Sequence, residues 1–170
     1  MNKLTLAKNL VKIQASILGG TPFYSTLFVT RKCNSECVFC NVHNKEKREL
    51  TLEEIKRIID EMDDFGIRFV TVTWGEPILR RDIFEILHHI ESKKMLYSMV
   101  SNGTLWNEEK IDEIRKRRIF TLSFSLDSLS QKKYREIRSP SVRRHPFLRL
   151  ETSFTIRGFA IFPSWTRTTS

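Results

Sequence analysis

Short β-type runs alternate with helical patterns from residue 21 onward, and this alternation constrains the fold more than any other feature of the chain. The candidate strands are STLFVT, IRFVTVT, MLYSMV and IFTLSFSL, at residues 25–30, 67–73, 95–100 and 119–126. Amphipathic segments with the apolar spacing of a helix separate them. Strands that alternate with helices are typical of a parallel sheet covered by helices, so we expect an α/β fold.

Some helical segments carry their own start and stop signals. Thr51 and Glu54 have the spacing of a capping box, and Gly66 is placed to end the helix that follows. Asn107 is a candidate cap for the segment NEEKIDEIRKRR. The buried stripe expected for the first of these helices is Leu52, Ile55, Ile59 and Met62.

Residues 1–22 predict an N-terminal amphipathic helix. Its apolar stripe consists of Leu6, Leu10, Ile13 and Ile17. Lysines at positions 3, 8 and 12 interrupt any run long enough for a signal-peptide core or a membrane span. We therefore expect no membrane span and a cytoplasmic location.

The formal net charge of +9 raises the question of a nucleic-acid partner. Lys and Arg are mostly interleaved with Asp and Glu along helical segments, as in EEKIDEIRKRR at residues 108–118. This pattern indicates solvated helix faces, so we expect no nucleic-acid partner for the core.

The segment RKCNSECVFC, residues 31–40, contains every cysteine of the chain: Cys33, Cys37 and Cys40. Clustered cysteines in a cytoplasmic protein more often bind metal than form disulfides. The residues leave two kinds of site open. One is a tetrahedral zinc site completed by His43. The other is a cubane iron–sulfur cluster held through three of its irons, with the fourth iron open.

Three further unusual segments follow the same rule as the cysteines, because each lies at the carboxyl end of a predicted strand. They are WGEP at 74–77, SNG at 101–103 and SLD at 125–127. Ligands bind at this edge in parallel barrels and open α/β sheets. The sequence therefore predicts one binding edge built from four loops.

These motifs resemble those of the radical S-adenosylmethionine (SAM) superfamily. CNSECVFC, with Phe39 before the last cysteine, is similar to the CxxxCxΦC signature, and GEP is similar to the family's GGEP. SNG and SLD resemble the third-strand and fourth-strand motifs of the molybdenum-cofactor biosynthesis and peptide-modifying branches. The resemblance covers residues 23–138 and implies a partial (β/α) barrel.

The resemblance implies an enzyme of the oxidoreductase or transferase class. A [4Fe–4S] cluster on Cys33, Cys37 and Cys40 would bind the amino and carboxylate groups of SAM at its open iron. Reductive cleavage of SAM would give a 5′-deoxyadenosyl radical that abstracts hydrogen from an unknown substrate. The electron would come from a low-potential donor such as flavodoxin or ferredoxin. No catalytic side chain is assigned.

SAM contacts are also implied by the resemblance. Gly75, Glu76 and Pro77 would offer backbone and carboxylate acceptors to the SAM ammonium. Trp74 stands where the family has the first glycine of GGEP. Its bulky side chain either reshapes the SAM pocket or points outward into the helix layer.

The two later motifs would supply further polar contacts. Ser101 and Asn102 would contact the SAM carboxylate or ribose, unless SNG is only a turn. Ser125 and Asp127 would contact SAM or substrate, with a helix cap as the alternative role for Asp127.

Residues 139–170 differ in character from the core, with five Arg, no Lys and many Ser and Thr. We interpret them as a divergent basic tail after a radical SAM core that is incomplete beyond its fourth strand. The alternative function is a zinc-stabilised Cys3His binding module whose basic tail contacts nucleic acid. That interpretation leaves the strand-end motifs without a purpose.

Overall fold

The computed structural model describes residues 3–40, 42 and 48–138. His43 and the predicted tail at 139–170 lie outside these residues. The elements run in the order α1 (Lys3–Gly19), β1 (Tyr24–Phe28), α2 (Leu52–Asp64), β2 (Phe69–Thr73), η2 (Pro77–Leu79), α3 (Ile83–Ser92), β3 (Leu96–Ser101), α4 (Glu108–Arg115), β4 (Thr121–Phe124) and α5 (Gln131–Arg138). All four predicted strands are present; β1, β2 and β4 are shorter than their runs in the sequence, and β3 has the expected length but is shifted by one residue.

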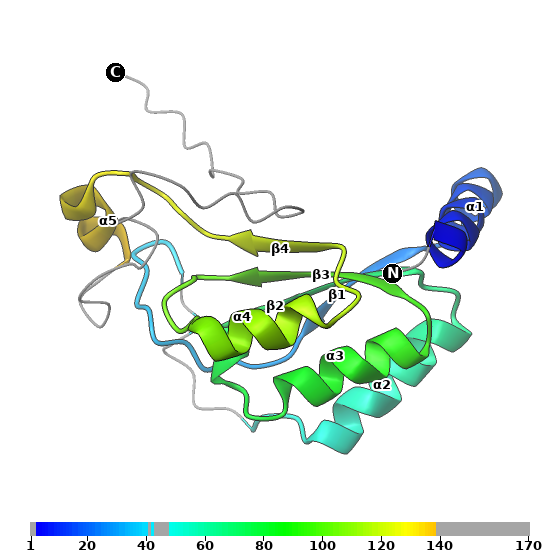
Figure 1. Cartoon of the computed structure of the whole chain (residues 1–170), viewed down its shortest axis with the longest axis horizontal. Coiled ribbons are helices and arrows are strands. Elements are labelled where there is room, and N and C mark those ends of the chain that lie inside the picture. Colours follow the sequence, from blue (N-terminus) through cyan, green and yellow to red (C-terminus); the bar gives the residue numbers. More distant parts are fainter. Residues whose placement is uncertain (1–2, 41, 43–47, 139–170) are drawn as a thin grey trace.

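The strands form one parallel sheet in the order β1-β2-β3-β4. Leu27 is in register with Val72, Val72 with Met99, and Met99 with Leu122, so one apolar row crosses the sheet. Helices α2, α3 and α4 lie on one face of the sheet (Figure 1). The predicted α/β class is confirmed, and within the described residues the sheet is open.

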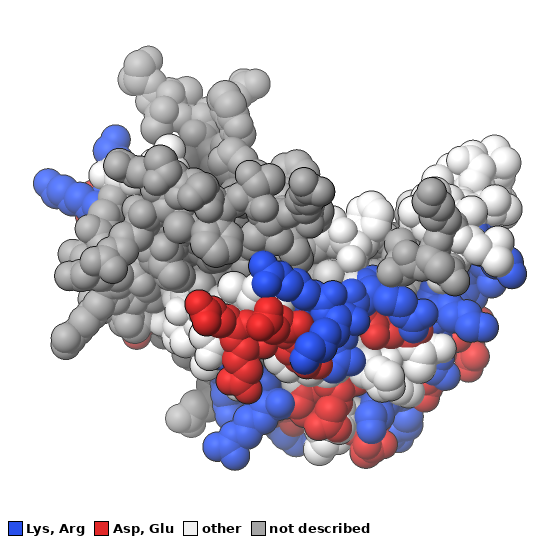
Figure 2. Space-filling view, in the orientation of Figure 1, with Lys and Arg blue, Asp and Glu red and all other residues white. Residues whose placement is uncertain are grey.

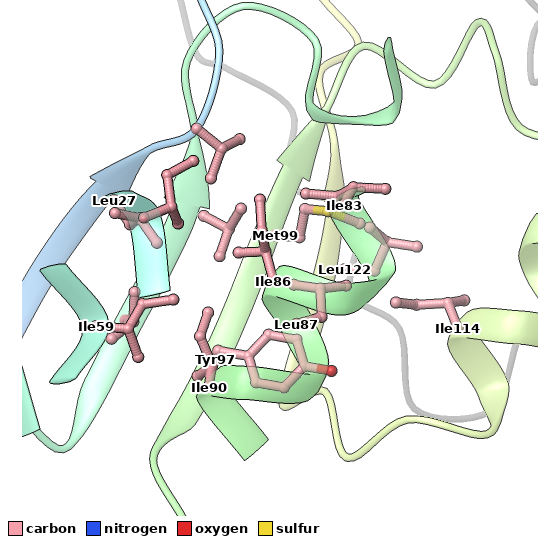
Figure 3. Packing of buried hydrophobic residues seen from close by; sticks show 14 of the residues in the cluster. Leu27, Ile59, Ile83, Ile86, Leu87, Ile90, Tyr97, Met99, Ile114 and Leu122 are labelled. Atoms are coloured by element: carbon pink, nitrogen blue, oxygen red, sulfur yellow. The ribbon is translucent and has the colours of Figure 1, made fainter. Parts of the chain in front are cut away.

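The core lies between that face and the helices. Side chains from α3 lie together with those of β3 and β4, and Ile59 of α2 lies beside Leu27 of β1 (Figure 3). The fully buried members from the two long core helices are Ile55, Ile59, Ile83, Ile86, Leu87 and Ile90. Burial of each such side chain contributes about 1.5–3 kcal/mol, so this layer supplies most of the stabilisation.

The opposite face of the sheet is more polar. Every second residue of β2 is only half-buried, and the hydroxyl groups of Thr71 and Ser98 form a hydrogen bond of 2.9 Å there. Tyr24 and Phe28 of β1 are about half exposed on it. Strands of a parallel sheet are usually covered on both faces, so this second face is suited to further contacts.

The end signals of α2 are confirmed. The Thr51 side chain accepts a hydrogen bond from the Glu54 amide, and the Glu54 carboxylate accepts one from the Thr51 amide. Gly66 follows the C-terminal cap with a φ of 95°, a conformation that favours glycine. Asn107 likewise caps α4 through its side chain.

Helix α1 is present as predicted, but its apolar stripe is not buried as a unit. Leu10 and Ile17 are each 53% exposed, whereas Leu6 and Ile13 are half-buried. The side that faces the rest of the molecule is set by the buried Asn9, whose amide donates to the Lys94 carbonyl at 2.9 Å. Hydrophobic periodicity does not register this polar contact, which lies on the buried side of α1.

Charge on the described surface is mixed. Figure 2 shows Lys and Arg side by side with Asp and Glu over the helical face. Several of these neighbours form ion pairs, such as Arg117 with Glu113. None of the helices in the described part of the chain is both long and apolar enough to cross a bilayer.

Candidate cofactor-binding rim

The four predicted motifs come together at one edge of the sheet. The cysteine segment follows β1, WGEP follows β2, SNG begins at the last residue of β3, and SLD follows β4. Because the strands are parallel, these loops share the carboxyl edge, where α5 also lies (Figure 1). We define the rim as residues 29–40, 74–77, 101–106 and 125–127.

Glu76 joins the second and third loops of the rim and is 0% exposed. Its Oε1 accepts hydrogen bonds from the Ser101 hydroxyl at 2.8 Å and the Ile78 amide at 3.3 Å. Its Oε2 accepts one from the Asn102 amide at 2.7 Å. Burial raises the pKa of Glu76, and these three donors act in the opposite direction. The carboxylate thus holds two loops together, and its predicted contact with the SAM ammonium stays a prediction.

Gly75 brings the same loop against the chain before the first cysteine. The amide of Glu76 donates to the Lys32 carbonyl at 2.8 Å. Gly75 has a φ of 61°, and a Cβ at this position would collide with the Lys32 carbonyl oxygen and lie 2.8 Å from that of Thr30. Only glycine permits this close approach of two backbones.

Trp74 points away from the core. Its ring stacks on Phe28 with centroids 4.4 Å apart, and Phe28 lies on the more polar face of the sheet. Trp74 adopts a φ of 75°, which is uncommon for a bulky residue. Pro77 begins η2, where its missing N–H leaves no bond unmade.

Asn102 ties the third loop to the cysteine segment. Its Nδ2 donates to Asn34 Oδ1 at 2.8 Å and to Ser35 Oγ at 3.2 Å. Its Oδ1 accepts hydrogen bonds from the hydroxyl and the amide of Thr104, at 2.7 and 3.0 Å. The side-chain Nδ2 of Asn34 donates in turn to the Thr104 hydroxyl at 2.9 Å. The side chain of Asn102 therefore positions the residues between the first two cysteines.

Ser101 connects the third loop to the fourth. Besides donating to Glu76, its hydroxyl accepts hydrogen bonds from Trp106 Nε1 at 2.9 Å and the Gly103 amide at 3.0 Å. Its carbonyl accepts one from the Ser125 amide at 2.9 Å. The side chains of Ser101 and Asn102 are thus engaged within the protein, while Ser125 is half-buried at the start of SLD.

Asp127 forms an ion pair with Arg138, the last residue of α5. Its alternative role as a helix cap stays a prediction. At the start of α5 the Ser130 carbonyl accepts a hydrogen bond from the Tyr134 amide at 2.8 Å, and the Ser130 hydroxyl accepts one from the Lys133 amide at 3.5 Å. The fourth motif is therefore linked to a helix that sequence reasoning did not include in the site.

The three cysteines are free thiols on one loop. Cys37 is buried, while Cys33 and Cys40 are partly exposed, and the Cys40 amide donates to the Cys37 carbonyl at 2.9 Å in a tight turn. Burial raises the pKa of the Cys33 and Cys37 thiols, and the Arg138 guanidinium lowers both values. Positive charge at this loop favours the thiolate forms of Cys33 and Cys37.

Three cysteines on one loop are compatible with a cubane cluster. Within the described residues, no three His, Cys, Asp or Glu side chains converge as ligands of one metal ion would. Cysteines of a cubane each bind a different iron, so their sulfur atoms need not meet at a point. With His43 outside the described residues, the zinc interpretation is not supported by this geometry.

Sequence reasoning missed several residues that build the rim. The predicted site residues did not include Asn34 and Ser35 between the cysteines, or Thr104 and Trp106 after SNG. The missed signal was their type, since short polar side chains that flank a strand-end turn commonly bond neighbouring backbone and side chains. Arg138 carried no local signal, because its partner Asp127 lies on another loop.

The comparisons with known proteins agree with this arrangement. Residues 27–150 match the family described as the Radical SAM superfamily. The chain belongs to this superfamily, which is a family of enzymes that use a [4Fe–4S] cluster and SAM.

The alignments with relatives of assigned function cover only part of each relative's length. GTP 3′,8-cyclase from Desulforamulus reducens is 34% identical over 121 residues, which are 67% of this chain and 37% of the relative. A probable GTP 3′,8-cyclase from Pyrococcus abyssi is 34% identical over 64% of this chain and 36% of its own. The crystal structure of Streptococcus suis SuiB bound to S-adenosylmethionine aligns with a TM-score of 0.63 and 25% identity, over 72% of this chain and 30% of SuiB. The chain thus spans less than two fifths of the length of these relatives.

Proposed function

We propose that this chain binds a [4Fe–4S] cluster through Cys33, Cys37 and Cys40 and binds SAM at the same rim. The proposed reaction is the reductive cleavage of SAM to a 5′-deoxyadenosyl radical that abstracts hydrogen from a substrate. The observation that carries the proposal is the set of hydrogen bonds that joins the cysteine loop to the loops after β2, β3 and β4. A rim assembled in this way holds its ligand-binding groups before any ligand arrives.

The bound cofactors would supply electron transfer to the SAM sulfonium, and the protein would supply binding and orientation. Three thiolates hold the cluster and leave one iron for SAM. Glu76 acts by fixing the loops, since its carboxylate is fully buried and accepts three hydrogen bonds. The backbone of Gly75 and Pro77 and the polar groups of Ser125 supply contacts for SAM.

Asp127 has a different part in the proposal. Because it is paired with Arg138, it contributes to SAM binding through the placement of α5. Asn102 likewise acts through the cysteine loop, which its side chain contacts at Asn34 and Ser35, and Ser101 acts through Glu76. Their proposed contacts with the SAM carboxylate or ribose are part of the same proposal.

A low-potential electron donor such as flavodoxin or ferredoxin would reduce the cluster. The substrate is not assigned, because relatives that share this part of the fold differ in what their names state. One group is named as GTP 3′,8-cyclases, and SuiB has been crystallised with the precursor peptide SuiA. Fold alone does not select between a nucleotide and a peptide.

The proposal is tested by anaerobic reconstitution with iron and sulfide, followed by electron paramagnetic resonance of the reduced protein with and without SAM. We expect a reduced [4Fe–4S] signal that changes when SAM is added. A folded protein that takes up no iron would contradict the cluster assignment. A cluster signal that does not change when SAM is added would contradict the SAM site but support the cluster assignment.

Matched variants separate the cluster from zinc. Cys37→Ala should abolish iron uptake, because a cubane held by two cysteines is weakly bound. His43→Ala should leave iron uptake unchanged. If His43→Ala instead removed stoichiometric zinc from protein purified without iron, the Cys3His site would replace the cluster.

A further inference from the structure

We infer that Arg138 is a positioning residue for the cluster, which holds the cysteine loop against α5 and sets a positive charge beside the thiolates. This inference rests on the proposed function, since it concerns the same three cysteines. Arg138 belongs to no motif in the sequence, and the rim as predicted did not include it.

The first observation is the environment of the guanidinium. Arg138 is only 7% exposed and is ion-paired with Asp127. Its Cζ lies 5.8 Å from the ring centroid of Phe39 and 5.9 Å from that of Tyr134. A buried cation needs such partners, because desolvation of an unpaired guanidinium is costly.

The position of Phe39 gives this contact its meaning. Phe39 lies between Cys37 and Cys40, and its side chain is 65% exposed, so it is not fixed by the core. The contact with Arg138 ties this exposed aromatic residue to α5. A cation over an aromatic ring contributes about 0.5–2 kcal/mol.

A backbone hydrogen bond joins the same two segments one residue earlier. The amide of Val38 donates to the Ile137 carbonyl at 2.9 Å. Ile137 lies in the last turn of α5, where the carbonyl groups accept no hydrogen bond from within the helix. Two adjacent residues of α5 thus contact two adjacent residues of the cysteine loop, which makes the end of this helix a clamp.

The charge of Arg138 acts in the same direction as its contacts. The guanidinium lies over the ring of Phe39, which directly precedes Cys40, so its positive charge is placed beside the cysteine loop. A reduced cluster carries one more negative charge than an oxidised one. Positive charge beside it stabilises the reduced state and raises its reduction potential.

Arginine is suited to this combination of tasks. Its planar guanidinium stacks on an aromatic ring while its N–H groups bind a carboxylate, and it stays charged when buried. Lysine would keep the charge and lose the stacked geometry. The two variants therefore separate charge from clamping.

The test uses the full chain, reconstituted anaerobically, with the cluster potential measured by a redox titration monitored by electron paramagnetic resonance. Arg138→Leu should take up less iron than the wild type, and its cluster should have a more negative potential. Arg138→Lys should keep a potential near that of the wild type and take up less iron. Lys133→Leu, an exposed cation on the same helix, is the matched control and should change neither value.

Asp127→Asn keeps the inference testable if Arg138→Leu does not fold. Removal of the acidic partner leaves the cation in place, so the potential should move in the positive direction, opposite to Arg138→Leu. A purely structural pair would give no such opposite shifts. Phe39→Leu provides a second check, since its exposed side chain should not affect folding but its loss should reduce iron uptake.

The outcomes for this inference and for the proposed function are distinct. If the wild type folds but binds no cluster, the proposed function fails. If the wild type binds the cluster and Arg138→Leu shows the same iron content and reduction potential, the inferred role of Arg138 is wrong. The cluster assignment is then unaffected. Unchanged potential in Asp127→Asn would likewise overturn the charge part of the inference.

Discussion

The helix-packed core and the rim of the sheet are built by different forces. The core consists of apolar side chains such as Ile59 and Ile86, which need only the right size and periodicity. The rim consists of directional bonds from a few polar groups, with Glu76 and Asn102 at the centre. Each buried aliphatic side chain contributes about 1.5–3 kcal/mol. Each neutral hydrogen bond contributes only about 1 kcal/mol but specifies a position.

This difference separates stability from function. Changes in the core should lower the free energy of unfolding and leave the cluster site of the folded protein intact. Changes in the rim should alter cofactor binding by more than their effect on stability implies. The variants below test that separation, from the largest effect to the smallest.

Gly75→Ala should have the largest effect. The new Cβ would collide with the Lys32 carbonyl oxygen and force apart two backbones that the Glu76 amide joins. We expect a loss of about 4 kcal/mol or more in the free energy of unfolding. The reconstituted variant should also take up little iron, because Lys32 precedes Cys33. Chemical unfolding and iron analysis measure the two effects.

Gly20→Ala is the matched control. Gly20 has a φ of 67°, close to the 61° of Gly75, but a Cβ there would meet no atom within 4 Å. The control should therefore cost only the backbone strain, about 1–2 kcal/mol, and leave iron uptake unchanged. Equal losses in the two variants would mean that the close approach at Gly75 has no special importance.

Ile86→Ala tests the core side of the comparison. Ile86 is fully buried in α3 against the sheet (Figure 3). Its truncation should reduce the free energy of unfolding by about 2–5 kcal/mol. Iron uptake per folded chain should equal that of the wild type. Leu18→Ala on α1, where the side chain is 79% exposed, is the control and should change neither stability nor iron uptake. A defect in cluster loading would show that core and rim are coupled.

Trp74→Gly restores the glycine of GGEP and should have a small net effect on stability. The change relieves a positive φ at a bulky residue, worth about 1–2 kcal/mol. It also removes the stack on Phe28, worth about 0.5–1.5 kcal/mol. Thermal unfolding should therefore change little. A large loss would show that the aromatic pair supports the rim, and altered SAM binding would show that Trp74 borders the cofactor.

The same division explains what could be predicted from the sequence. Periodicity and caps predicted α2 and the four strands, because Thr51, Glu54 and Ile59 act within one element or against the core. The motifs predicted where the rim lies, because parallel strands end at one edge. The hydrogen bonds within the rim could not be predicted. Asn34 and Asn102 are 68 residues apart, and an asparagine in a sequence does not indicate which residue it will bond. Arg138 was missed for the same reason, as was the buried contact of the Asn9 side chain with the Lys94 carbonyl.

The smallest effect concerns the capping box of α2, where local sequence alone determines an exposed electrostatic contact. The ion pair with Arg48 and the hydrogen bond from the Thr51 amide lower the pKa of Glu54 to about 2. A lowered pKa in the folded state means that the carboxylate stabilises the protein above its ordinary pKa of about 4.5, and that this contribution is lost as the pH falls toward about 2. The stability difference between wild type and Glu54→Gln should therefore be largest near neutral pH and shrink on acidification. Chemical unfolding over that pH range measures it, with Glu53→Gln in the same helical turn as the control. A difference that does not change with pH would mean that Glu54 acts through its shape and hydrogen bonds, as a core residue does, and not through its charge.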